Sequence, residues 1–98
     1  MAAYVIAEIE VHDPAAYRVY MDAAPATIAR HGGRYLARGG AAEALEGAGP
    51  KRIVVLEFPT AEAARRWFDS PEYRDATALR QKASTGRFLL VDGLASSA

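Results

Sequence analysis

The stretch "RHGGRYLARGG", residues 30–40, places two glycine pairs around a short run of strand-forming residues. The first pair, Gly32-Gly33, follows a helical pattern that ends near His31, and a glycine just past a helix readily adopts the left-handed conformation that ends it. A dinucleotide-binding loop needs the opposite order, with its glycines after a strand and before a helix. We therefore interpret the pairs as a helix stop and, at Gly39-Gly40, a β-bulge.

The segment before this stretch predicts one strand and one helix. Residues 3–11 carry apolar side chains at every second position, which is typical of a half-buried strand. Asp13-Pro14 then supplies an N-cap and a first-turn proline for a helix that ends near Arg30. Because the residue before a proline disfavours the helical conformation, we expect a kink or a restart at Ala24, before Pro25.

The quoted stretch and the segment after it predict three more strands and two helices. Thr60 is an N-cap residue, and Ser70-Pro71-Glu72 combines the cap, proline and acid that start a further helix. The remaining elements are strands over 34–38 (resuming over 43–46), 52–58 and 86–92, and helices after Thr60 and over about 71–83.

This order of elements is that of an α+β, ferredoxin-like βαββαβ domain with an antiparallel sheet. Residues 1–98 form one domain, with a frayed tail over 94–98. Both helical segments cover one face of the sheet, and the opposite face, which includes Ile6, has no helix to cover it. A small chain rarely leaves such a face wet, so we expect a homodimer in which two sheets pack face to face.

The composition excludes several classes of function. The chain has 98 residues, 12 basic and 12 acidic side chains, and no cysteine. The balanced charge gives no indication of nucleic-acid binding, and cysteine chemistry is impossible. His12 and His31 do not have the spacing of metal ligands, so no metal is expected. The N-terminus lacks a signal-peptide pattern and no window is long enough to span a membrane, so the expected location is cytoplasmic.

Two longer segments carry a family resemblance: "DPAAYRVYMDAAPATIARHGGRYLARGG" and "VVLEFPTAEAARRWFDSPEYRDATALRQKAS". They resemble the uncharacterised family known as domain of unknown function 1330, over Tyr4 to Gly93. The resemblance implies a dimeric α/β barrel, in a superfamily that includes cofactor-free monooxygenases, muconolactone-type isomerases, haem-dependent enzymes and stress-related proteins. Some of the monooxygenases are thought to use an asparagine, and this chain has none.

Six residues are candidates for a site. We expect Tyr20, Trp67 and Tyr73 to shape a small apolar cleft, although stripes at helical spacing are more often core. Arg38 is a candidate ligand for a substrate carboxylate, and it pairs across the sheet with Glu57 if the bulge at Gly39-Gly40 shifts the register. His31 either caps its helix or moves a proton, and Glu57 is the alternative candidate for moving the proton.

The resulting hypothesis is a small dimeric protein that binds an apolar or aromatic carboxylate-type molecule between sheet and helices, without a cofactor. A cofactor-free monooxygenase or isomerase-like enzyme is one alternative, and a non-catalytic structural dimer is another. The sequence shows no acid–base pair of fixed spacing, so these alternatives stay open.

Overall fold

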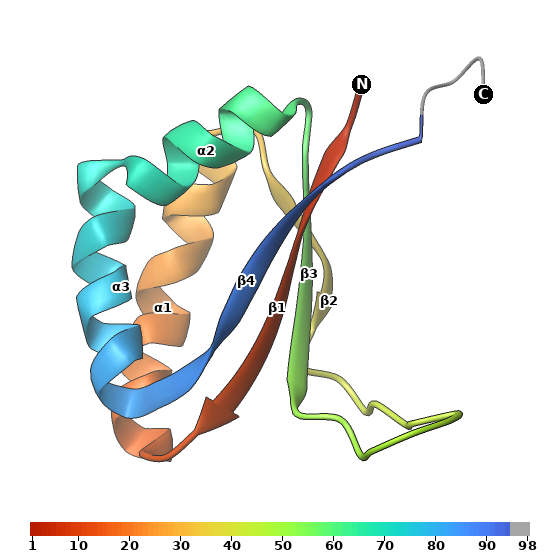
Figure 1. The fold of residues 1–98 in the computed structure, drawn as a ribbon. Coiled ribbons are helices and arrows are strands. Elements are labelled where there is room, and N and C mark those ends of the chain that lie inside the picture. Colours follow the sequence, from red (N-terminus) through yellow and green to blue (C-terminus); the bar gives the residue numbers. More distant parts are fainter. Residues whose placement is uncertain (95–98) are drawn as a thin grey trace.

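The computed structural model describes residues 1–94, and its fold is the α+β, ferredoxin-like one expected. One antiparallel sheet has the strand order β2-β3-β1-β4, and all three helices lie on the same side of it (Figure 1). The elements are β1 (Ala3–Val11), α1 (Pro14–Arg30), β2 (Arg34–Arg38), β3 (Arg52–Phe58), α2 (Ala61–Asp69), α3 (Pro71–Ala83) and β4 (Ser84–Asp92).

The two central strands confirm the alternating pattern. In β1, Val5, Ala7 and Ile9 are buried beneath the helices, and in β3 the buried positions are Val54, Leu56 and Phe58. The register pairs Val5 with Leu56 and Ala7 with Val54, so one face of both strands supplies the floor of the core.

Helix α1 begins as predicted but is not interrupted at Pro25. The Asp13 carboxylate caps it by accepting a hydrogen bond from the Ala16 backbone N–H, at 3.1 Å. The helix continues through Pro25 to Arg30, so the restart, one of the two outcomes predicted at Ala24, does not occur. A proline has no N–H to donate to the carbonyl four residues earlier, and that carbonyl, of Met21, bonds the Arg38 guanidinium instead.

The Gly32-Gly33 pair ends α1 as expected, in a Schellman motif. The Gly33 N–H donates to the Ile28 carbonyl at 2.9 Å and the Gly32 N–H to the Ala29 carbonyl at 3.0 Å. Gly32 has a φ of 78°, in the left-handed region that favours glycine.

The β-bulge lies earlier than predicted. The register between β2 and β3 shifts between Tyr35 and Ala37, not at Gly39-Gly40. Residues 43–46 do not resume the strand, because the chain leaves the sheet after Arg38 and returns to it only at Arg52. The intervening loop extends on the side away from the helices (Figure 1).

Ser70 joins the last two helices as the Ser-Pro-Glu pattern predicts. Its hydroxyl donates to the Trp67 carbonyl at 2.8 Å and accepts from the Tyr73 N–H at 3.3 Å, so it ends α2 and caps α3. Strand β4 begins at Ser84, two residues before the predicted start. Of the predicted frayed tail, Leu94 is exposed and outside any strand, and residues 95–98 lie outside the described residues.

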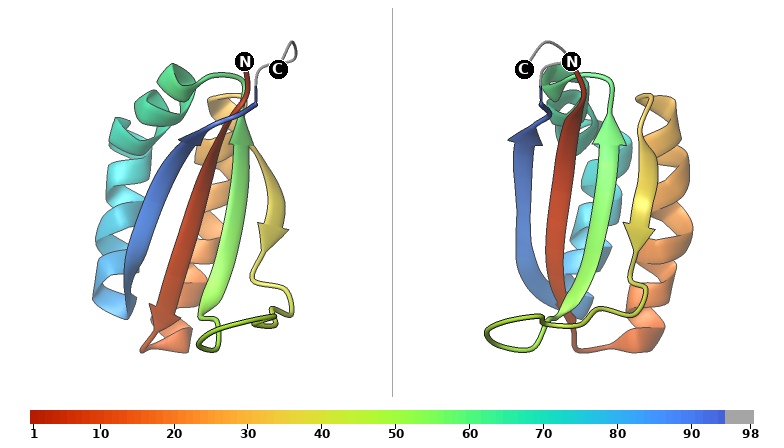
Figure 2. Two further views of the ribbon diagram at one scale, coloured as in Figure 1. Left: turned by 45° about the vertical axis from the view of Figure 1, so that its right-hand side comes forward. Right: turned by 90° about the vertical axis from the view of Figure 1, so that its right-hand side faces the viewer.

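The helix-free face of the sheet is largely apolar. Figure 2 shows this face without a covering helix. The strand registers place on it Tyr4, Ile6, Ile53, Val55, Leu89 and Val91. Two ion pairs, Arg34–Glu57 and Arg87–Glu8, flank the apolar set. Among residues 1–94, no helix has the length and apolar character needed to cross a membrane.

Candidate functional site

A small cavity lies between α1 and the sheet, and we call it the α1 cavity. Its volume is about 20 Å³, which is room for about one water molecule. Most of its wall is apolar or aromatic, and two arginines complete it. The lining residues are Ala7, Ile9, Tyr17, Tyr20, Met21, Ile28, Tyr35, Arg38, Arg52, Val54, Leu56 and Phe88.

Arg38 and Arg52 reach this cavity from neighbouring strands. The Arg38 Nη2 donates to the Met21 carbonyl at 2.5 Å, and its Cζ lies 4.6 Å from the centre of the Tyr35 ring. The Arg52 Nη2 lies 3.9 Å from the Met21 sulfur, and its Cζ lies 5.5 Å from the centre of the Tyr17 ring. Neither arginine forms an ion pair with a carboxylate of residues 1–94, and the Arg52 Nε is buried without a hydrogen-bond partner there.

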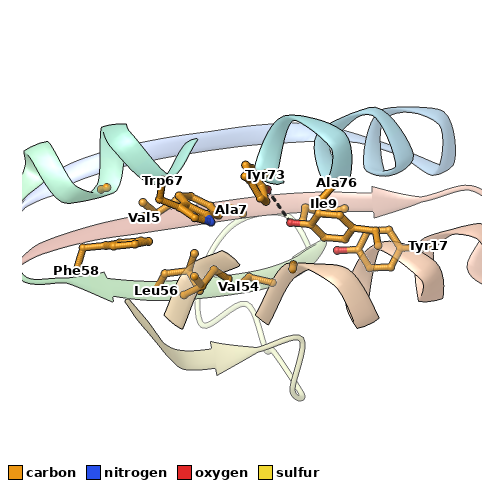
Figure 3. Packing of buried hydrophobic residues seen from close by; sticks show 14 of the residues in the cluster. Val5, Ala7, Ile9, Tyr17, Val54, Leu56, Phe58, Trp67, Tyr73 and Ala76 are labelled. Carbon is orange, nitrogen blue, oxygen red and sulfur yellow. Dashed lines mark hydrogen bonds between the residues drawn. The ribbon is translucent and has the colours of Figure 1, made fainter. Parts of the chain in front are cut away.

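Tyr20 lines the cavity, and its hydroxyl lies 2.7 Å from that of Tyr73 (dashed line in Figure 3). Burial raises the pKa of Tyr20 well above its ordinary value, and the neighbouring Tyr73 raises it further. Burial also raises the pKa of Tyr73, although Tyr20 and Arg80 partly oppose this rise. Both side chains therefore remain neutral hydroxyls at ordinary pH and can donate hydrogen bonds.

Trp67 and Tyr73 belong to the core and do not line the α1 cavity. Both are completely buried, and their ring centres are 4.1 Å apart (Figure 3). The Trp67 Nε1 donates to the Thr27 hydroxyl at 3.1 Å, and the ring packs on Phe58 at a centre distance of 5.2 Å. The predicted trio therefore does not converge on one void: only Tyr20 lines the cavity, and Tyr73 reaches it through their shared hydrogen bond.

The predicted pairing of Arg38 with Glu57 was wrong. Arg38 lies beside Val54, whose side chain faces the helices, whereas Glu57 lies beside Arg34 on the helix-free face. The Glu57 carboxylate accepts a hydrogen bond from Arg34 Nε at 2.7 Å. Because the bulge lies at Leu36 rather than Gly39-Gly40, the register that would bring Arg38 to Glu57 does not form.

His31 lies at the end of α1, away from the α1 cavity. Its Nδ1 is 3.0 Å from the Thr27 carbonyl, one helical turn earlier, which is the arrangement of a capping side chain. Glu72, on α3, lies near it: its own backbone N–H and Arg30 lower the pKa of that carboxyl, and His31 contributes to the lowering. Within residues 1–94 no cluster of side chains is suited to hold a metal ion.

Sequence reasoning missed two arginines. Arg52 alternates with the buried Val54 and Leu56 along β3, so strand periodicity alone could have placed it on the inner face. Arg80 lies seven residues after Tyr73, on the same face of α3, and is 7% exposed. An arginine at that spacing would ordinarily be predicted to be solvated, because fully buried arginines are rare.

A known family matches almost the whole length of the chain. A family model described as "Domain of unknown function (DUF1330)" matches residues 2–94. The chain belongs to this family. The match confirms the resemblance found in the sequence and, by the family's own description, brings no established function to the DUF1330 chain. No curated protein matches it.

Several solved structures share this DUF1330 fold. The protein of unknown function RPA0582 from Rhodopseudomonas palustris is 19% identical, with a TM-score of 0.77 over 96% of this chain and 83% of that one. SnoaB, a cofactor-independent oxygenase from Streptomyces nogalater, is 17% identical, with a TM-score of 0.67 over 97% and 95%. Rv0793 from Mycobacterium tuberculosis is 20% identical, with a TM-score of 0.57 over the whole of both chains. Identities this low show a common fold alone.

Proposed function

We propose that this DUF1330 protein binds a small aromatic or apolar carboxylate in an enlarged α1 cavity. The observation that carries this proposal is the meeting of aromatic rings with two arginines that have no carboxylate partner in residues 1–94. An apolar wall with a few convergent polar groups is the usual form of a ligand site, and a guanidinium binds a carboxylate through two parallel hydrogen bonds.

Binding requires the cavity to open, because about 20 Å³ does not hold an aromatic ring. Met21 and Arg38 separate the cavity from an open hollow of about 360 Å³, lined also by Arg18, Asp22 and Pro25. The unbranched methionine side chain repacks readily, and Arg38 is exposed and held by one backbone carbonyl. A ligand entering here would displace the Met21 thioether. Its carboxylate would then replace Met21 as the hydrogen-bond partner of Arg52 and Arg38.

Two copies of the chain would pack their helix-free faces together, as in a dimeric α/β barrel. Leu89 and Val91 on this face are 40% and 43% exposed, and they are continuous with Ile6 and Val55. Replacement of Ile6 by Asp would place a charge in the middle of the shared face, and we expect sedimentation to show a monomer. Sedimentation of the wild-type protein as a monomer at micromolar concentration would contradict the proposed dimer.

An enzymatic role is the second candidate, favoured by the structural similarity to the oxygenase SnoaB. A monooxygenase or isomerase-like reaction would have to proceed without either predicted proton-transfer residue at the cavity, because Glu57 faces the other side of the sheet and His31 lies at a helix end. Tyr20 is then the proton-bearing group in contact with a bound molecule.

Calorimetric titration of phenylacetate, with benzyl alcohol as a neutral analogue, tests the ligand proposal. We expect phenylacetate to bind and Arg52→Met to weaken it about tenfold to hundredfold, because a hydrogen bond to a charged group contributes about 1.5–3 kcal/mol. Arg34→Met, which removes an arginine from the opposite face, is the matched control. Equal affinity of wild type and Arg52→Met would exclude a carboxylate site at Arg52.

A further inference from the structure

The inward face of α3 carries a row of polar side chains. Tyr73, Thr77 and Arg80 follow one another at spacings of four and three residues, and they are 0%, 4% and 7% exposed. Spacings of three and four place side chains on one helix face. The buried Thr77 hydroxyl and Arg80 Nε have no hydrogen-bond partner in residues 1–94.

Arg80 is a buried cation without a carboxylate. None of the ion pairs among residues 1–94 includes it, and none of the 12 acidic side chains is buried. Its Cζ lies 4.2 Å from the centre of the Phe88 ring and 5.9 Å from that of Tyr20. Aromatic faces compensate part of the lost hydration of a guanidinium, but an unpaired buried charge remains costly.

The neighbouring hydroxyl pair also has one proton that can donate to a ligand. In the 2.7 Å contact between Tyr20 and Tyr73 one hydroxyl donates and the other accepts, so one proton of the pair is not used in it. The guanidinium of Arg80 has only donors. Tyr20 and Phe88 both line the α1 cavity, and Arg80 lies against both rings. The groups behind this wall of the cavity therefore lack a carboxylate, and a negatively charged acceptor would satisfy them best.

We propose that Arg80, with the Tyr20 and Tyr73 hydroxyls, binds an anionic oxygen of the ligand where the enlarged α1 cavity reaches past the Tyr20 and Phe88 rings to α3. This inference rests on the proposed function, in which Arg52 and Arg38 hold the ligand's carboxylate near Met21. The two groups of donors belong to different elements, α1 with α3 and β2 with β3, and the α3 donors lie behind the Tyr20 and Phe88 wall of the cavity. The ligand class is then an aromatic acid with a second, acidic oxygen, such as a phenol or an enolisable ketone.

The probe is 4-hydroxy-3-nitrophenylacetate, whose phenolate absorbs visible light where its phenol does not. Arg80 would favour the bound phenolate, so we expect the visible band of the bound probe to appear at lower pH than for the free one. The proton affinity of the phenolate should be weakened about tenfold to hundredfold, the factor for one hydrogen bond to a charged group. The reference probe, 3-nitrophenylacetate, lacks the hydroxyl and reports carboxylate binding alone.

Arg80→Met tests the residue, and Arg74→Met, an exposed arginine of the same helix paired with Asp69, is the control. We expect Arg80→Met to keep its affinity for 3-nitrophenylacetate and to melt at or above the wild-type Tm without ligand. With this variant the phenolate band of the bound probe should appear at the same pH as that of the free probe. A merely structural Arg80 would instead lower the Tm. If Arg80→Met binds neither probe, Tyr73→Phe, which keeps the ring, should reduce the difference between the pH values at which the bound and the free probe show this band.

The outcomes separate the two proposals. If the wild type binds both probes but does not change the pH at which the phenolate band appears, the Arg80 site is overturned and the proposed function stands. The same holds if Arg80→Met changes that pH as much as the wild type does. If the wild type binds neither probe, the proposed function fails, and the Arg80 site fails with it.

Discussion

Replacing Gly33 by alanine should destabilise the protein by overpacking the end of its core. A Cβ atom at this position would lie 2.6 Å and 2.8 Å from two carbons of the Phe58 ring and 2.9 Å from the Ile28 Cγ2. Phe58 is completely buried and its ring packs on Trp67, so it cannot move without disturbing the aromatic core. The φ of Gly33 is not positive, and the expected loss therefore comes from steric contact alone.

Overpacking a well-packed core costs about 1–3 kcal/mol. In a domain of this size each kcal/mol lowers Tm by about 4–8 °C. Thermal unfolding followed by circular dichroism, together with urea titration, would measure both quantities. Gly40→Ala is the matched control, because its Cβ would meet nothing within 4 Å and its φ is not positive. If Gly33→Ala and Gly40→Ala melted together with the wild type, the packing of the α1 end on Phe58 would be wrong.

Two further predictions concern groups on the α1 side of the sheet. Burial raises the pKa of Tyr20 and Tyr73, so the folded protein holds these protons more tightly than the unfolded chain, whose tyrosines titrate near 10. The contribution of these two tyrosines to stability is thus fully present below about pH 10 and is lost as the pH rises further. Tyrosinate absorbance should show Tyr20 and Tyr73 ionising only when the protein unfolds. Ionisation of all 5 tyrosines in the folded protein near pH 10 would contradict this. Separately, Arg38→Met should lower the free energy of unfolding by about 1 kcal/mol, because the Met21 carbonyl loses its hydrogen-bond donor. In a protein that also carries Pro25→Ala, Arg38→Met should have no such effect, because the alanine backbone supplies the missing N–H. Additive effects of the two changes in urea titration would exclude this coupling.

The sequence determined most of the fold because its signals were local. Asp13, Thr60 and Ser70 each cap the helix that the pattern assigned to them, and the Gly32-Gly33 pair ends α1. The errors occurred where tertiary contacts override local preference. Pro25 disfavours a helix locally, but α1 continues because Tyr20, Ala24 and Ile28 are buried on one face across it.

The site was less predictable, because it depends on the register of β2, its shortest strand. A bulge at Leu36 rather than at Gly39-Gly40 turns Arg38 toward the helices and leaves Glu57 on the other face. Strand periodicity cannot locate a bulge in 5 residues with mixed polarity. The aromatic trio was divided for a different reason: helical spacing shows that Tyr20, Trp67 and Tyr73 face inward, but not whether a ring meets a void or another ring.

The distribution of charge connects these observations to function. The chain is neutral overall, yet its carboxylates are exposed or half-buried, while Arg80 is buried and Arg52 half-buried without acidic partners among residues 1–94. A fold selected for stability alone would gain by replacing such an arginine with an apolar side chain of similar volume. Guanidinium groups at and beside an aromatic cavity are explained if a bound anion supplies their missing charge partner during function. Binding of that anion would then stabilise the folded state in proportion to its occupancy, so its chemistry can be sought by the thermal stabilisation it gives.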